Sequence, residues 1–477
     1  MVAIFTGLGA GFERGSGAAL GGGGLLGSSS LGRGGEGAFL NAATGNLILS
    51  RQDEFLVGRG PDVAIARTYN SLGALDDNGD QWRQSTDRRV YGLTGTVNTA
   101  GSTIKRVSAD GSEITYTWQT GNFYQATDGA GAHDRLVFAS ASNEWTWTDG
   151  SSRWTEVYGA PVSGIHRITF QRDADGNTLT FTYVSGAPDK LDKVTTQDGA
   201  YIQYTWSGSN ITQIVTGYDD LVTAPTTVVT LTRTRYAYDA SNRLVQVITD
   251  LSPNDNVIAD GQTYTTTYTY DGTSKRVATI TQIDGSSLAI TYETSGAFRV
   301  TSLVQTVGAS DARTTTIAYF ADRTEITDPR GQVTKLYTNA TDGRLTRVVA
   351  PQAFAGATAQ QIDYTYDAAG NVLTMVSAGA TTTYVYDANG NVTRVTDANG
   401  NITDRTYTAT NALALETRTG TSASGAASTL YTRYVYDSEN HLRYAISAEG
   451  RVSEYRYLTT GELRFTIDYP QHAYGIG

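Results

Sequence analysis

The stretch Tyr364-Thr-Tyr366-Asp367-Ala-Ala-Gly370-Asn-Val372 decides the fold, because it returns as Tyr384-Val-Tyr386-Asp387-Ala-Asn-Gly390-Asn-Val392. Residues two apart in a strand face the same side, so Tyr-x-Tyr places two rings on one surface. The aspartate that follows, with glycine three positions later, matches a type I turn that ends on a left-handed residue. The pattern therefore predicts a unit of strand, turn and strand.

The same unit occurs along much of the chain. Further copies are Tyr236-Ala-Tyr238-Asp239, Tyr268-Thr-Tyr270-Asp271 and Tyr434-Val-Tyr436-Asp437, and a second half-unit ends at Tyr337, Tyr407 and Tyr457. Degenerate versions begin at Asp110, Asp173 and Asp198. We take as repeat-defining residues Tyr238, Asp239, Tyr270, Asp271, Tyr366, Asp367, Gly370, Tyr386, Asp387, Gly390, Tyr407, Tyr436, Asp437 and Tyr457. Repetition at this spacing predicts an all-β fold, in which antiparallel strand-turn repeats form a spiralling, shell-like or open curved sheet with tyrosine rings stacked between strands.

Composition agrees with a β-rich chain and excludes several functions. The 477 residues include 30 tyrosines, 52 glycines and no cysteine. Without cysteine there are no disulfides, thiol nucleophiles or zinc-thiolate sites. The net charge of −11 repels phosphate backbones, so nucleic acid is not an expected partner. No run of 18 apolar residues predicts a transmembrane helix, and the first residues lack a recognisable Sec signal peptide.

The texture of the sequence divides the chain into five parts. Residues 1–37 are a glycine-rich leader, interpreted as flexible, with the alternative that its leucines and alanines plug the end of a β structure. Residues 38–99 form an N-terminal segment of strands and turns, and residues 100–235 hold degenerate repeats. Well-formed repeats occupy residues 236–469, and residues 470–477 read as a polar tail.

These copies resemble the YD repeats of the Rhs family, which includes bacterial Rhs toxins, subunits of insecticidal toxin complexes and the teneurin ectodomain. Thr44-Gly-Asn-Leu47, Asp53-Glu-Phe-Leu-Val-Gly58 and Arg67-Thr-Tyr-Asn-Ser71 resemble the segment that precedes the repeats in bacterial members. The resemblance implies a hollow shell that can enclose a C-terminal toxin. The family's closing segment, autocleavage site and variable effector have no recognisable match before Gly477. We expect either the N-terminal part of a longer shell or a member without cargo.

Other candidate chemistry is explained more simply by structure. His133, His166, His441 and His472 occur singly, so no metal set or catalytic group is expected, and no cofactor. Asp76–Asp80 and Asp173–Asn177 have the alternating oxygens of a calcium loop, but the second has Val184 where a bidentate glutamate belongs, which favours a plain turn. Trp145, Trp147 and Trp154 are either part of the core or a platform for sugars.

The leading hypothesis is a non-enzymatic shell or scaffold of a secreted or cell-surface bacterial protein of Rhs type, acting in toxin encapsulation or delivery between cells. The alternative is an adhesive or carbohydrate-binding surface module, and a polysaccharide hydrolase is a third possibility. An unpaired strand edge invites another strand. We therefore expect the edge near Tyr455 to Ile467 to pair with further repeats, another subunit or a capping segment. An enclosed toxin domain or surface glycans are the other candidate partners.

Overall fold

The computed structural model describes residues 2–7, 11–12, 30–31, 35–73, 79–126, 134–220, 224–307, 311–354, 356–421, 425 and 427–470. These residues form strands and turns and contain no helix, which confirms the predicted all-β fold. Accordingly, no helix in the described ranges is long and apolar enough to cross a bilayer. His133, His472, Gly21–Gly24, Asp76–Asn78 and the tail from 471 lie outside the described residues.

The first six strands form a separate sheet. They are β1 (Ala3–Phe5), β2 (Ser30–Leu31), β3 (Glu36–Asn41), β4 (Leu47–Leu56), β5 (Val63–Asn70) and β6 (Trp82–Gln84). β1 pairs with β3 in parallel, whereas the other pairs in this sheet are antiparallel. The described parts of residues 1–37 thus include β1, β2 and the first residues of β3, an arrangement that differs from a flexible leader. Leu31 and Phe5 supply the physical reason, because both are buried in apolar clusters.

The next eight strands form a closed ring. They are β7 (Arg89–Thr94), β8 (Thr103–Val107), β9 (Glu113–Gln119), β10 (Phe123–Ala126), β11 (Arg135–Ala139), β12 (Glu144–Thr148), β13 (Thr155–Tyr158) and β14 (Ile165–Arg172). Each pairs with the next in antiparallel fashion. β14 also pairs with β7, which closes the ring.

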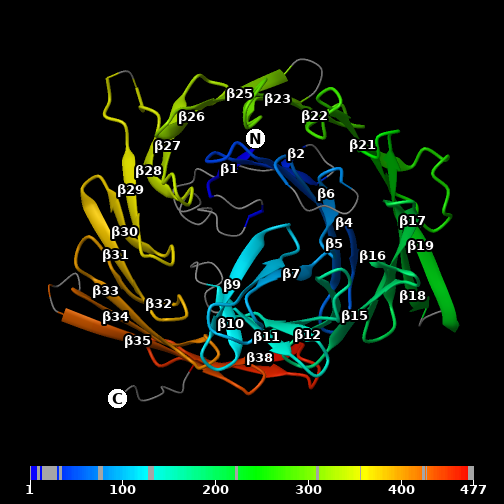
Figure 1. The fold of residues 1–477 in the computed structure, drawn as a ribbon. Helices are drawn as coiled ribbons and strands as arrows, with labels where there is room; N and C mark the ends of the chain where they lie inside the picture. Colours follow the sequence, from blue (N-terminus) through cyan, green and yellow to red (C-terminus); the bar gives the residue numbers. More distant parts are fainter. Residues whose placement is uncertain are drawn as a thin grey trace.

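The remaining strands continue from β14 as one long antiparallel meander, each paired with the next. They are β15 (Thr178–Val184), β16 (Ala187–Thr196), β17 (Tyr201–Ser207), β18 (Asn210–Asp220), β19 (Ala224–Tyr238), β20 (Leu244–Asp250), β21 (Thr263–Tyr270), β22 (Val277–Gln282), β23 (Ser287–Tyr292), β24 (Val300–Val307), β25 (Asp311–Tyr319), β26 (Arg323–Thr327), β27 (Val333–Thr338), β28 (Leu345–Val349), β29 (Gln361–Tyr366), β30 (Val372–Ser377), β31 (Ala380–Tyr386), β32 (Val392–Thr396), β33 (Ile402–Tyr407), β34 (Leu413–Thr421), β35 (Ala427–Tyr436), β36 (Leu442–Ile446), β37 (Val452–Tyr457) and β38 (Leu463–Tyr469). Figure 1 shows that this meander curves into a wide ring with the first sheet inside it.

The meander returns to the eight-stranded ring from which it starts, and the contact is made by turns. Asn411 Nδ2 donates to the Gly150 carbonyl at 3.1 Å, and Asn177 Nδ2 donates to the Thr460 carbonyl at 2.9 Å. His441 Nε2 lies 3.0 Å from an Asp175 carboxylate oxygen. We call this zone, where residues 411–461 meet residues 150–177, the seam. In Figure 1, β38 accordingly lies near β11 and β12.

The apolar core follows the contact between the inner sheet and the meander. One buried cluster joins strands from β2 to β25, and a second joins Phe5 and Ile48 to residues of β26–β29. Among described residues after β30, Ile446 is the one buried apolar side chain. The shared core therefore extends along the meander from β15 to β29, while β31–β38 keep a half-exposed inner face.

The repeat turns have the geometry that their sequence predicts. Gly370 donates its N–H to the Asp367 carbonyl at 3.1 Å and has φ +89°, a conformation that favours glycine. Asn440 takes the corresponding left-handed position with φ +72°. The Asp367 carboxylate accepts from the Asn371 backbone at 2.8 Å and from its side chain at 2.9 Å. The aspartate thus fixes the turn with both oxygens.

The last tyrosine of most units joins neighbouring turns through its hydroxyl. Tyr386 Oη donates to the Val372 carbonyl at 2.8 Å, at the start of the preceding strand. The same bond is made by Tyr270 to Leu244, Tyr366 to Leu345, Tyr407 to Val392, Tyr436 to Leu413 and Tyr457 to Leu442. These bonds form a ladder of hydroxyl contacts that the sequence pattern did not predict, at the points where the strand register shifts.

Candidate functional site

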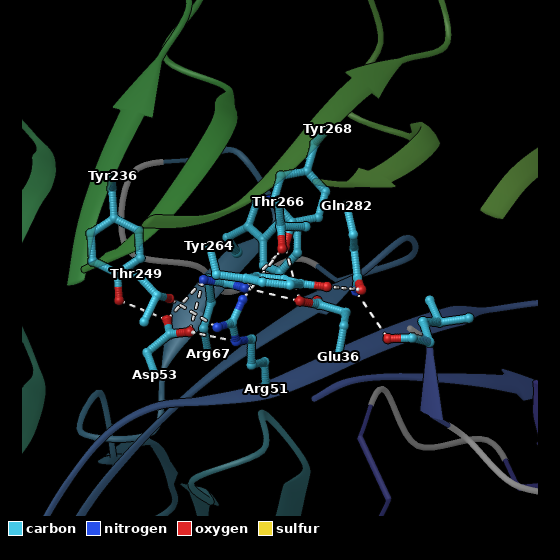
Figure 2. A network of polar contacts seen from close by, with 12 residues as sticks. Glu36, Arg51, Asp53, Arg67, Tyr236, Thr249, Tyr264, Thr266, Tyr268 and Gln282 are labelled. Carbon is cyan, nitrogen blue, oxygen red and sulfur yellow. Dashed lines mark hydrogen bonds and ion pairs between the residues drawn. The ribbon is translucent and has the colours of Figure 1, made fainter. Parts of the chain in front are cut away.

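The most elaborate polar site is a buried network that fastens the inner sheet to the meander (Figure 2). Arg67 on β5 is its centre. Arg67 Nη1 donates to both oxygens of Asp53 on β4, at 3.0 and 2.8 Å, and Nη2 lies 3.2 Å from Glu36 Oε2 on β3. Three neighbouring inner strands thereby direct charged groups to one point.

The meander meets this point with hydroxyl groups. Tyr236 Oη on β19 donates to Asp53 at 2.6 Å, and Tyr268 Oη on β21 donates to Glu36 at 3.0 Å. Arg51 adds a second connection, since its two Nη atoms donate to the hydroxyls of Thr266 at 3.3 Å and Thr249 at 2.9 Å. Figure 2 shows these side chains converging from the two layers.

Burial determines the electrostatics of the network. It raises the pKa of Tyr236 and Tyr268 well above the ordinary value, so both hydroxyls remain protonated donors. Burial also raises the pKa of Glu36, and nearby Arg67 opposes that effect. The two carboxylates and two guanidinium groups balance in charge, and the Arg67 guanidinium lies 4.9 Å from the Trp82 ring centre.

This network holds the two layers together, and we call its residues the joint: Glu36, Arg51, Asp53, Arg67, Tyr236, Thr249, Thr266 and Tyr268. Most of its donors and acceptors bind one another, while Arg51 Nε, Arg67 Nε and Glu36 Oε1 have no hydrogen-bond partner among the described residues. The hydroxyls with raised pKa values are poor nucleophiles. Removal of one partner from a buried ion pair typically costs about 3–5 kcal/mol, because the other charge stays buried. The network therefore fixes the position of the inner sheet relative to the surrounding meander.

The seam contains a pocket of about 410 Å³ beside Trp154. Trp154 is 37% exposed, whereas Trp145 and Trp147 are buried in the core. Trp147 Nε1 donates to Tyr116 Oη at 3.1 Å inside that core. Of the proposed sugar platform, only Trp154 lies where a ligand can reach it.

The other candidates from the sequence have structural surroundings. His166 is buried, its Nδ1 lies 2.8 Å from the Gly159 carbonyl, and burial lowers its pKa. Asp173 accepts from the Asn177 backbone and side chain, both at 2.8 Å, like the repeat aspartates. Within the described ranges, no three His, Asp or Glu side chains gather in a way that could hold a metal ion.

Sequence reasoning quoted the segments that contain Asp53 and Arg67 but assigned them no role. A signal was present in β5, where Arg67 occupies a position on the same buried face as Ile65 and Tyr69. The partners on β19 and β21 were singled out only as repeat tyrosines, and their bonds depend on a contact about 200 residues away in sequence.

The fold and the joint define a class: a curved antiparallel sheet of Tyr-Asp hairpins, wrapped around a sheet formed by the N-terminal residues. The family model of the RHS Repeat matches residues 386–423, and the model of a domain of unknown function (DUF6531) matches residues 37–116. These matches confirm the resemblance to the Rhs family.

Similar proteins include the tRNA nuclease WapA of Bacillus subtilis strain 168 and the tRNA3(Ser)-specific nuclease WapA of Bacillus spizizenii. Each is 40% identical over 57 residues, which is 12% of this chain and 2% of the relative. The crystal structure of TcdB2-TccC3 without its hypervariable C-terminal region aligns with 91% of this chain and 31% of that chain, at 9% identity and a TM-score of 0.39. The Photorhabdus luminescens Tc holotoxin pore aligns over the same shares at 10% identity and a TM-score of 0.36. The chain thus spans a small part of these proteins.

Proposed function

We propose that the chain is a non-enzymatic structural shell of a secreted or cell-surface bacterial protein, acting in toxin encapsulation or delivery between cells. The observation that carries this proposal is the course of the meander, which encircles the inner sheet and meets the eight-stranded ring again at the seam. The RHS repeat match supports it. The tRNA nuclease relatives match over too short a segment to extend their activity to this chain.

The half-exposed inner face of β31–β38 is where we expect an enclosed domain to lie. The inner sheet covers the middle strands and leaves this face without a covering layer among the described residues. Tyr384 and Tyr434 present rings there that are only partly buried. A partly exposed aromatic surface is more stable when a protein partner covers it than when it is in contact with water.

The edge of β38 is the second expected contact. Among the described residues, β38 pairs with β37 alone, and Leu463 and Phe465 are each about half exposed. An open strand edge with apolar side chains pairs readily with another strand. We propose that further repeats or another subunit bind at this edge.

A competition assay tests the function. A strain that carries the gene should outgrow a co-cultured neighbour, and deletion of the gene should abolish that advantage.

Light scattering tests the edge of β38: the purified chain should associate as its concentration rises, and the double substitution Leu463→Lys with Phe465→Lys should keep it monomeric. Phe354→Lys, at an exposed position away from the edge, is the control. A wild-type chain that stays monomeric would contradict the proposed edge contact.

The exposed ring of Trp154 in the seam pocket favours a second candidate, a carbohydrate-binding surface module. Sugar rings stack on exposed indoles, and the serines and carboxylates around the pocket offer hydrogen bonds. A glycan array decides between the two functions. Specific binding that is lost in Trp154→Ala and kept in Phe354→Ala would favour this candidate, and silence on the array would favour the shell.

A further inference from the structure

A second cluster of charges lies where β7 and β14 close the first ring, and its charges do not balance. Arg83, Arg89 and Arg167 all face one carboxylate, Asp87. Arg89 is ion-paired with Asp87 Oδ2, and the nearest guanidinium nitrogens of Arg83 and Arg167 each lie 3.5 Å from an Asp87 carboxylate oxygen. One carboxylate thus serves three guanidinium groups.

The strand register makes this arrangement costly. Arg89 on β7 and Arg167 on β14 are direct cross-strand partners in the pairing that closes the ring. Like charges placed directly opposite each other destabilise a sheet. The cost is greater here than at the surface, because both side chains are more than four-fifths buried.

The two arginines also retain hydrogen-bonding capacity. The Nε atoms of Arg89 and Arg167 are buried and have no hydrogen-bond partner within the described part of the chain. The Arg89 side chain is only 9% exposed, so bulk water does not satisfy it. A buried donor without an acceptor is unfavourable, and it marks a place where an acceptor is missing.

A pocket of about 100 Å³ adjoins these donors. It is lined by Asp87, Arg89, Arg167, Asp189, Lys190, Trp206 and Ser209. The lining holds three cationic side chains and two carboxylates, which leaves one positive charge in excess. This local excess occurs in a chain whose net charge is −11. The volume is several times what one water needs, so it accommodates a small polyatomic anion.

We propose that this pocket binds a small tetrahedral oxyanion, of the inorganic phosphate or sulfate class, between Arg89 and Arg167. Guanidinium groups bind such oxygens through short, charge-assisted hydrogen bonds. The anion neutralises the excess charge and supplies acceptors to the two Nε atoms. It thereby joins β7, β14 and β16, the strand that carries Lys190.

Calorimetric titration of the full chain with inorganic phosphate, at constant ionic strength set with sodium chloride, tests the proposal. We expect saturable binding at one site. Thermal unfolding at a hundredfold excess of phosphate over the dissociation constant should occur about 2–3 °C higher than in chloride alone. Sulfate in a parallel titration distinguishes the two oxyanions, and its competition with phosphate shows that they share the site.

Variants assign the site. Arg167→Gln should weaken phosphate binding about tenfold or more, since it removes charge-assisted hydrogen bonds. Lys190→Gln should weaken phosphate binding by a smaller factor, and this variant tests the site if Arg167→Gln does not fold. Arg313→Gln is the matched control, because Arg313 pairs with Asp311 on the exposed surface. Absence of saturable binding, or unchanged binding in both Arg167→Gln and Lys190→Gln, would overturn the proposal.

Discussion

Replacement of Tyr386 by phenylalanine tests how the repeats hold together. The substitution removes one oxygen atom and leaves the ring in place, so it deletes the bond from the hydroxyl to the Val372 carbonyl. That bond links the turn after β31 to the turn before β30. If hydroxyl bonds of this kind hold successive turns in register, the turn formed by residues 367–371 should open more often.

The expected size follows from one neutral hydrogen bond. Such a bond contributes about 1 kcal/mol net, which corresponds to roughly a fivefold change in an opening equilibrium. The 2.8 Å length and the partial burial of Tyr386 support a value near this figure. The same change at Tyr386, Tyr407 and Tyr436 together should cost about 3 kcal/mol if the sites act independently.

Hydrogen exchange followed by mass spectrometry measures this locally and needs no global two-state transition. Amides in the 367–372 peptide should exchange about fivefold faster in Tyr386→Phe. Tyr384→Phe is a matched control two residues away on the same strand and face. Its hydroxyl makes no hydrogen bond among those found in the described residues, so exchange should stay close to wild type. Equal acceleration in both variants would refute the role given to the second tyrosine.

Three further outcomes are expected. Arg67→Met should lower the free energy of unfolding by about 3–5 kcal/mol, measured by urea denaturation, because Asp53 and Glu36 then stay buried without their cation. Burial alone would raise the pKa of Glu156, but Arg106 and Arg88 lower it to about 2. The resulting stabilisation of about 3 kcal/mol is complete above the unfolded pKa of 4.5 and should be lost as the pH falls from 4.5 toward 2. Glu156→Gln should therefore flatten the pH dependence of the urea midpoint. Gly331→Ala should cost about 1–2 kcal/mol through its φ of +79° alone, because an added Cβ meets no atom within 4 Å, and calorimetry should show this as a lower melting temperature.

Much of the fold was predictable from the sequence because the residues that determine each strand end and turn are close together in the chain. Tyr366, Asp367 and Gly370 define a strand end and a turn within five residues, and each strand pairs with its neighbour in the chain. The hydroxyl bond of Tyr366 to Leu345 was not predictable from the pattern, since it depends on the register shift at the strand end.

The joint and the charged pocket could not be predicted from the sequence, for a different reason. Arg67 meets Tyr268 across about 200 residues, and Arg89 meets Arg167 across about 80. Nothing in either local sequence fixes such pairings, because they depend on the curvature accumulated over many strands. The glycine-rich leader was read from composition, which does not reveal that Phe5 and Leu31 have apolar surfaces to cover.

The order of strand pairing along the meander has a consequence for synthesis. Because each strand from β15 onward binds the one made just before it, a chain leaving the ribosome can add hairpins one at a time to a growing edge. The inner sheet is made first and is available as the surface on which the later strands settle. Whole hairpins can then be gained or lost in evolution with local effects, whereas a change in the first ninety residues alters the template for the rest.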